Sequence, residues 1–265
     1  MKRIFITGAS SGIGLATTQA LLARGDEVWG TSRKVSNLPN HERFHSVRLD
    51  LQNTGEIDEI FGRALAEAGH FDVVINNAGS GHFGPAELLS AVEITELFEV
   101  LFFSHVRLMQ LALADMRRSG RGRVINVTSL ATLLPVPFMG AYNAAKSAMA
   151  AFTMSLQIEL GDGAVRVIDV QPADIRTNFN DAVSRNRETG YEARVAKTWN
   201  AVDKNMKSAP GPELVARAIL NVIDQADPPM RVLVGDVFQA KIAPFIFRFL
   251  PQRTRIWGLK KYYGI

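Results

Sequence analysis

Tyr142 and Lys146 lie four residues apart in the stretch GAYNAAKSAM, so in a helix they share one face. A phenol beside an ammonium can transfer protons, because the positive charge favours phenolate and brings a pKa of about 10 closer to neutral. The same spacing arises on any amphipathic helix, where a Lys snorkels past a half-buried Tyr. The pair alone therefore leaves two interpretations open, a proton-transfer site and an ordinary helix surface.

A glycine-rich loop, ITGASSGIGLA, joins the first strand-like segment to the first helix-like segment. Glycines permit a sharp turn and a close approach of backbone to a diphosphate, and the following helix presents free N–H groups to it. The spacing departs from G-x-G-x-x-G and also fits a plain tight turn. As a dinucleotide site, the loop would contribute Gly8, Ser10, Ser11, Gly12, Ile13 and Gly14.

Residues 8–12 also fit G-x-S-x-G, the nucleophile elbow of α/β-hydrolases, with Ser10 as nucleophile. That elbow belongs at the centre of a sheet, and its triad runs in the order Ser, acid, His. Here the turn follows the first strand and every histidine lies at or before His105. Hydrolase activity is therefore the remote alternative.

Strand-like and helix-like segments alternate along the chain, which predicts one α/β domain with a doubly wound parallel sheet of about seven strands and helices on both faces. Such sheets bind ligands at the carboxyl ends of their strands. We expect strands near residues 3–7, 27–32, 43–50, 72–77, 123–129, 165–170 and 231–235, and helices near 12–25, 54–68, 89–118, 141–160 and 212–225.

The composition of the 265 residues, 47% hydrophobic and 21% charged, is typical of a globular protein without an apolar run long enough to cross a bilayer. The absence of cysteine excludes disulfides, Cys-held zinc and iron–sulfur clusters, and we expect no metal site. The start, MKRIFITG, has an apolar segment too short for a signal peptide, so we expect a cytoplasmic protein. The net charge is +4, and no acid follows Asp236.

Four motifs occur together in order: Thr7-Gly8-x-x-x-Gly12-Ile13-Gly14, Asn76-Asn77-Ala78-Gly79, Ser129 ahead of Tyr142-x-x-x-Lys146, and Pro172-Ala173-Asp174-Ile175-Arg176-Thr177. From Lys2 to about Gly235 this set resembles the classical short-chain dehydrogenase/reductase family. The resemblance implies a single Rossmann-fold domain over residues 1–235 that interconverts a carbonyl and an alcohol with a nicotinamide cofactor.

Carbonyl reduction delivers a hydride to carbon and leaves negative charge on oxygen, so it needs a proton donor and a hydrogen-bond donor aimed at that oxygen. The resemblance implies that Tyr142 is the general acid, or the base in oxidation, and that Ser129 orients the carbonyl. It implies that Lys146 lowers the Tyr142 pKa and binds the nicotinamide ribose.

Other cofactor contacts carry over by position. Asp50, with Leu51 beside it, matches the family acid that meets the adenine, although it also fits an ordinary helix cap. The resemblance assigns the ribose, carboxamide and diphosphate contacts to Asn77, Ala78, Gly79, Pro172, Ile175 and Thr177.

The second strand ends in WGTSRK, where an enzyme that prefers the unphosphorylated cofactor would place an acid on the ribose hydroxyls. Ser32 and Arg33 stand there instead, and a guanidinium matches a 2′-phosphate. We therefore expect NADP(H) rather than NAD(H), the alternative being that Arg33 is simply solvated.

The segment LFEVLFFSH places Leu101 where the family usually has a catalytic Asn. One interpretation is that a nearby backbone carbonyl compensates, with His105, one turn later, either contributing or packing. The other is weakened catalysis, which would leave a dinucleotide-binding sensor or scaffold. Retention of Ser129, Tyr142 and Lys146 favours an active enzyme.

Residues 179–209 match the family's variable substrate loop and lid, and they mix apolar residues with charges. We expect a hydrophobic ketone or aldehyde and its alcohol, as in the branch that includes steroid and retinoid dehydrogenases, in a pocket with His82, Phe83, Leu130, Phe138 and Phe179.

The basic, aromatic extension 236–265 either lies weakly on an anionic membrane or packs on its own domain or on a partner subunit. We find no nucleic-acid-binding motif. By resemblance we expect a homodimer or homotetramer through the helices that carry Leu101 and Tyr142.

Overall fold

The computed structural model describes residues 1–179, 183–185 and 190–265. Its main sheet has seven parallel strands in the order β3-β2-β1-β4-β6-β7-β9. The predicted doubly wound parallel sheet of about seven strands is therefore confirmed. The strands are β1 Arg3–Ile6, β2 Glu27–Ser32, β3 Phe44–Arg48, β4 Val73–Asn76, β6 Gly122–Val127, β7 Val165–Pro172 and β9 Arg231–Val234.

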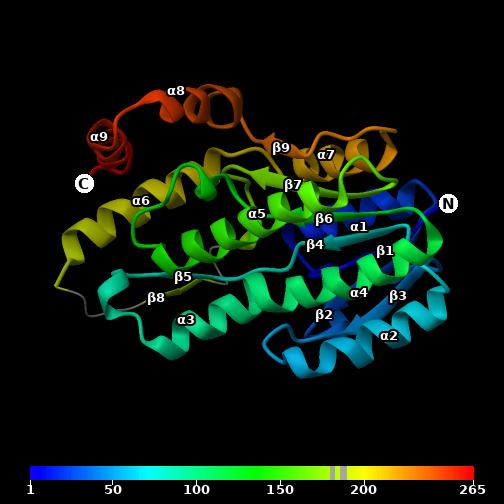
Figure 1. Cartoon of the computed structure of the whole chain (residues 1–265). Coiled ribbons are helices and arrows are strands. Elements are labelled where there is room, and N and C mark those ends of the chain that lie inside the picture. Colours follow the sequence, from blue (N-terminus) through cyan, green and yellow to red (C-terminus); the bar gives the residue numbers. More distant parts are fainter. Residues whose placement is uncertain (180–182, 186–189) are drawn as a thin grey trace.

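Helices cover both faces of this sheet (Figure 1). Parallel neighbours need a crossover, and the helix-periodic segments of the sequence supply it. The helices are α1 Gly12–Ala23, α2 Ile57–Ala68, α3 Ala91–Phe98, α4 Ser104–Ser119, α5 Gly140–Leu160, α6 Glu192–Ser208, α7 Glu213–Asp224, α8 Ala243–Phe249 and α9 Gln252–Tyr263.

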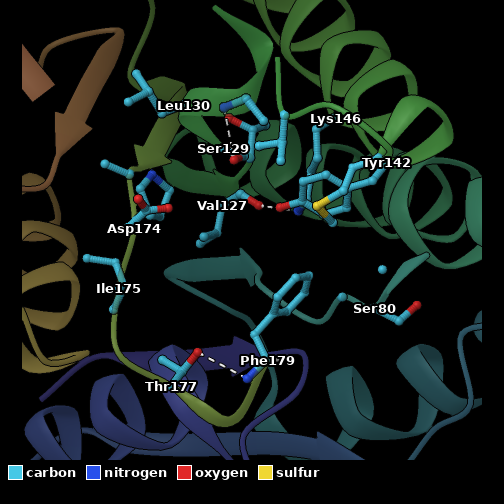
Figure 2. Close-up of a pocket in the computed structure, with 18 of the residues that line it drawn as sticks. Ser80, Val127, Ser129, Leu130, Tyr142, Lys146, Asp174, Ile175, Thr177 and Phe179 are labelled. Carbon is cyan, nitrogen blue, oxygen red and sulfur yellow. Dashed lines mark hydrogen bonds between the residues drawn. The ribbon is translucent and has the colours of Figure 1, made fainter. Parts of the chain in front are cut away.

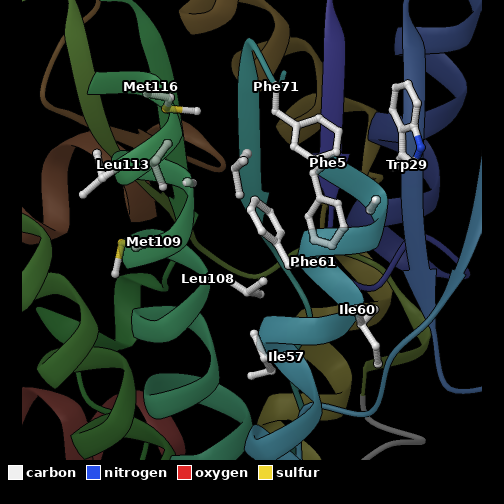
Figure 3. Close-up of a cluster of buried hydrophobic side chains, with 14 of the residues drawn as sticks. Phe5, Trp29, Ile57, Ile60, Phe61, Phe71, Leu108, Met109, Leu113 and Met116 are labelled. Carbon is white, nitrogen blue, oxygen red and sulfur yellow. The ribbon is translucent and has the colours of Figure 1, made fainter. Parts of the chain in front are cut away.

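Alternate side chains of each strand enter opposite hydrophobic cores. In β1, Phe5 packs with Phe61 of α2 and Leu108 of α4 on one face (Figure 3), whereas Ile4 and Ile6 face α1 and α7 on the other. Because a strand side-chain period is two residues, this alternation fixes the register of the sheet against both helical layers.

The helical run from Ala91 to Ser119 is interrupted by a π-helical turn, Glu99–Phe103. By length and composition alone this is the one described run that could cross a bilayer, contrary to our expectation that the sequence has none. Its Leu108 and Met109 are fully buried in the core, so this structure uses the apolar face of the run to cover the sheet.

Two features lie outside the predicted pattern. A small second sheet pairs β5, Gly81–Phe83, with β8, Val183–Arg185. The chain after Asp236 forms a π-helical turn, α8 and α9, which leave the end of β9 and run toward α6 (Figure 1). Of the predicted lid 179–209, residues 180–182 and 186–189 lie outside the described part of the chain.

Candidate active site

The glycine loop lies at the point where the strand order reverses, between β1 and β4. A Cβ on Gly14 would lie 2.0 Å from the Gly8 carbonyl oxygen, and a Cβ on Gly8 would lie 2.9 Å from the Ala78 Cα. The Thr7 hydroxyl accepts hydrogen bonds from the Asn77 and Ala78 N–H groups at 2.9 and 3.0 Å. These contacts hold the two loops so close together that only glycine fits.

The amino end of α1 faces the same cavity. Ser11 makes no side-chain capping bond, and Gly12 and Ile13 line the cavity. Backbone N–H groups at such a helix start favour an anion. The loop therefore fits the diphosphate of a dinucleotide.

Ser129, Tyr142 and Lys146 line this cavity together (Figure 2). Ser129 follows β6, and its hydroxyl accepts a hydrogen bond from the Ala131 N–H at 3.1 Å. Helix α5 carries the other two residues. Lys146, 5% exposed, donates from Nζ to the Val127 carbonyl oxygen at 2.8 Å.

The protonation of the pair depends on burial. In this structure the pKa of the Tyr142 phenol is raised rather than lowered: burial raises it, hydrogen bonding with Ser129 lowers it in part, and the charge of Asp174 raises it further. Burial lowers the pKa of Lys146 to about 8, against the attraction of Asp169. At neutral pH the phenol is thus protonated beside a mostly protonated amine, as a proton donor requires.

Leu101 is fully buried in the π-helical turn, where it packs with Ala141 and Ala145 of α5. The backbone carbonyl of Leu101 accepts a hydrogen bond from His105, and the Thr7 hydroxyl lies 3.3 Å from His105 Nε2. Burial and the charge of Lys146 lower the His105 pKa to about 3. His105 is therefore a neutral, hydrogen-bonded core residue, in agreement with the packing alternative.

The predicted adenine and ribose residues follow β2 and β3. The Ser32 hydroxyl donates to the Ser10 hydroxyl at 3.2 Å, and Arg33 is exposed beside it. Asp50 accepts from the Gln52 N–H at 3.1 Å, which is a local turn contact. Apart from Gly14, which packs behind the loop, the cavity is lined by all the predicted cofactor residues, namely Gly8, Ser10, Ser11, Gly12, Ile13, Ser32, Arg33, Asp50, Leu51, Asn77, Ala78, Gly79, Tyr142, Lys146, Pro172, Ile175 and Thr177.

The cavity has a volume of about 860 Å³, and apolar residues next to Tyr142, including Val136 and Met139, line the part that we call the substrate chamber. His82, Leu130 and Phe179 line it as predicted. Phe83 and Phe138 do not. Phe83 packs against Trp199 in a small core beneath α6, with ring centroids 4.8 Å apart, and Phe138 borders that core.

Val202 and Met206 of α6, which belong to the predicted lid 179–209, line this chamber. The rest of its outer wall was not predicted from the sequence, because it comes from the C-terminal extension, namely Phe238, Ile246, Phe247, Leu250 and Leu259. The apolar residues after Asp236 have helical spacing, which indicates amphipathic helices. This spacing does not indicate which surface those helices cover.

The hydrolase alternative has no support in this geometry. In the described part of the chain the Ser10 hydroxyl has Ser32 as its partner, and the nearby buried histidine, His105, bonds Thr7 instead. A nucleophilic serine needs a base within hydrogen-bond reach.

Comparisons with known proteins agree with the site. The signature of the short chain dehydrogenase family matches residues 2–188. The chain is 31% identical over 266 residues to a 3-ketodihydrosphingosine reductase of Bacteroides thetaiotaomicron, covering 99% of this chain and 98% of that protein. It is 28% identical over 251 residues to an NADPH-dependent 3-dehydrocapnine reductase of Ornithobacterium rhinotracheale, covering 89% and 88%.

Among solved structures, a short-chain dehydrogenase from Streptomyces avermitilis aligns with a TM-score of 0.79 and 32% identity, over 87% of each chain. The fold, the glycine loop and the family signature all agree. The chain belongs to the short-chain dehydrogenase/reductase family, whose members are oxidoreductases that use NAD(P) on carbonyl and alcohol groups.

Proposed function

We propose that this protein interconverts a hydrophobic ketone or aldehyde and its alcohol with NADP(H). The observation that carries the proposal is the convergence of Ser129, Tyr142 and Lys146 where a cofactor-shaped cleft opens into an apolar chamber. When bound, the nicotinamide supplies or accepts the hydride.

Each side chain has one task in this proposal. Ser129 donates a hydrogen bond to the substrate oxygen, and Tyr142 gives that oxygen its proton as negative charge develops. Lys146 holds positive charge next to the phenol and keeps its ammonium oriented through the Val127 carbonyl. Its remaining N–H groups would bind the nicotinamide ribose.

The preference for NADP(H) rests on Ser32 and Arg33. In the described part of the chain Arg33 is exposed and has no carboxylate partner, and it lines the cavity where the 2′-phosphate would lie. The name of the Ornithobacterium relative, which specifies NADPH, points in the same direction.

The substrate class rests on the chamber walls and on two relatives. Apolar residues from α6, α8 and α9 extend the cavity well beyond the reacting groups, as a long hydrocarbon chain or a polycyclic skeleton would require. The two relatives compared above are named a 3-ketodihydrosphingosine reductase and a 3-dehydrocapnine reductase. We propose a lipid carbonyl, with steroid and retinoid carbonyls as further members of the class.

We also propose where the protein works. Phe245 and Phe249 of α8 are 68% and 70% exposed, and their rings make an edge-to-face contact with centroids 5.3 Å apart. Every charged side chain after Asp236 is a Lys or an Arg. This surface would touch an anionic membrane from the cytoplasm and leave the chamber beside the lipid. Exposed Met154 and Ile158 on α5 suit a homodimer or homotetramer contact.

NADPH oxidation over a panel of long-chain, steroid and retinoid carbonyls tests the function. The wild-type protein should turn over at least one class, and Tyr142→Phe should lower kcat about 10²–10⁴-fold while NADPH binding stays unchanged. NADPH binding without tyrosine-dependent turnover would instead favour a sensor or scaffold, the alternative raised by Leu101 at the usual position of the catalytic Asn.

A further inference from the structure

Asp174 places a carboxylate in the wall of the substrate chamber. It lies in the segment that follows β7, and Figure 2 shows it on the side of the cavity away from Tyr142 and Lys146. Its charge nevertheless reaches Tyr142 strongly enough to raise the pKa of the phenol. Asp174, Tyr142 and Lys146 line one cavity, so a ligand group held by Asp174 would share that cavity with the reacting carbonyl.

This carboxylate has no counter-ion in the described part of the chain. The basic side chains that line the cavity are engaged elsewhere: Lys146 with a carbonyl of β6, Arg255 with two carbonyls at the end of α8, and Arg33 at the far adenine end. Asp236 adds a second negative charge near Asp174. This end of the chamber is thus negative as well as apolar.

The C-terminal extension orients the carboxylate. Gln239 donates from Nε2 to Asp174 Oδ2 at 2.6 Å, and its Oε1 accepts from the Asp174 N–H at 3.3 Å. Asp174 Oδ1 receives no hydrogen bond from the residues that the structure describes. One oxygen is therefore anchored, and the other is available to a ligand.

A half-buried carboxylate without a counter-ion is costly, and burial raises the pKa of Asp174 accordingly. A cation at the free oxygen would offset that cost and gain a charge-assisted hydrogen bond. We propose that Asp174 binds a cationic amino group of the substrate, a short distance along the chain from the carbonyl that Tyr142 protonates. The inference rests on the proposed function and narrows its substrate class to hydrophobic amino ketones.

Paired substrates test this specificity role. The full-length wild-type protein, Asp174→Asn and Asp162→Asn are compared on a long-chain 2-amino-3-ketone and on the same 3-ketone without the amino group. Asn at position 174 keeps the bond from Gln239 but removes the charge. We expect kcat/KM for the amino ketone to fall roughly 10–100-fold in Asp174→Asn, with the plain ketone unaffected. Asp162, whose side chain is 98% exposed and lies outside the cavity lining, is the control, and its variant should stay within about threefold on both substrates.

An equal loss on both ketones would overturn the inference, because Asp174 would then act by anchoring the extension or by facing the nicotinamide. No loss on either ketone would overturn it too. If the wild-type protein reduces a steroid or retinoid carbonyl but neither of these ketones, the proposed function stands and the inference is overturned. If it reduces no carbonyl, the proposed function fails, and calorimetric binding of a long-chain 2-amino alcohol with NADP⁺ present decides the role of Asp174 separately. Weaker binding to Asp174→Asn would support the inference, and equal binding would overturn it.

Discussion

Replacing Gly14 with Ala should disrupt the cofactor cradle while leaving the fold recognisable. The new Cβ would lie 2.0 Å from the Gly8 carbonyl oxygen and 2.5 Å from Asn77 Nδ2, whereas ordinary contacts of a Cβ lie beyond 3.4 Å. The start of α1 must therefore move away from the loop by about 1 Å or more, which takes an N–H group out of hydrogen-bond reach of the diphosphate. We expect NADPH affinity to fall roughly 10–100-fold, the effect of losing one hydrogen bond to a charged group.

The overpacking should also lower stability by about 1–3 kcal/mol, or roughly 3–10 °C in Tm. Gly62, in the middle of α2, supplies the matched control, because a Cβ there meets nothing within 4 Å. Gly62→Ala should bind NADPH normally and gain up to about 1 kcal/mol from helix propensity. Fluorescence titration with NADPH and thermal melts of both variants give the answer. Wild-type affinity in Gly14→Ala would refute the packing described for the loop.

Three other predictions follow from particular side chains. His105 is held neutral in the folded protein, so between pH 6.5 and 3 the unfolded chain binds more protons and the free energy of unfolding falls as pH falls. His105→Gln should remove roughly 3 kcal/mol of the loss between pH 7 and 4. Urea-unfolding free energies that fall equally with pH in the two proteins would contradict this. Arg33→Asp should raise KM for NADPH about 10–100-fold and improve use of NADH, and an intact NADPH preference would show that the 2′-phosphate binds elsewhere. Phe245→Glu with Phe249→Glu should abolish flotation with anionic liposomes without changing the melting temperature, because both rings are exposed, and flotation equal to wild type would remove the membrane surface from the account.

The sequence was sufficient to predict the sheet and its covering helices because the strands are short and apolar and the helices carry clear periodicity. The segments before the glycine loop and around Val124 are examples, since their alternate residues enter two different cores. The catalytic and cofactor positions could be predicted for a related reason, because each follows directly on a strand end or occupies one helix face.

The chamber was harder to predict, because its walls depend on packing between distant segments. Phe83 and Phe138 are aromatic, as pocket residues often are, yet they pack in a small core under α6. Phe83 lies in β5, and the pairing of β5 with β8 places it in that core. Asp174 gave no sign of its importance until the structure placed Gln239, 65 residues later, against it. Such long-range contacts leave no periodic pattern in the sequence.

A crystal structure of the protein with NADP(H) bound tests the central claim most directly. We predict a nicotinamide ring between Ile175 and the Tyr142–Lys146 face of α5, with its ribose within hydrogen-bond distance of Lys146 Nζ, about 3 Å. The adenosine 2′-phosphate should meet Arg33. A cofactor bound in the cleft with its nicotinamide turned away from the Tyr142 hydroxyl would contradict the account.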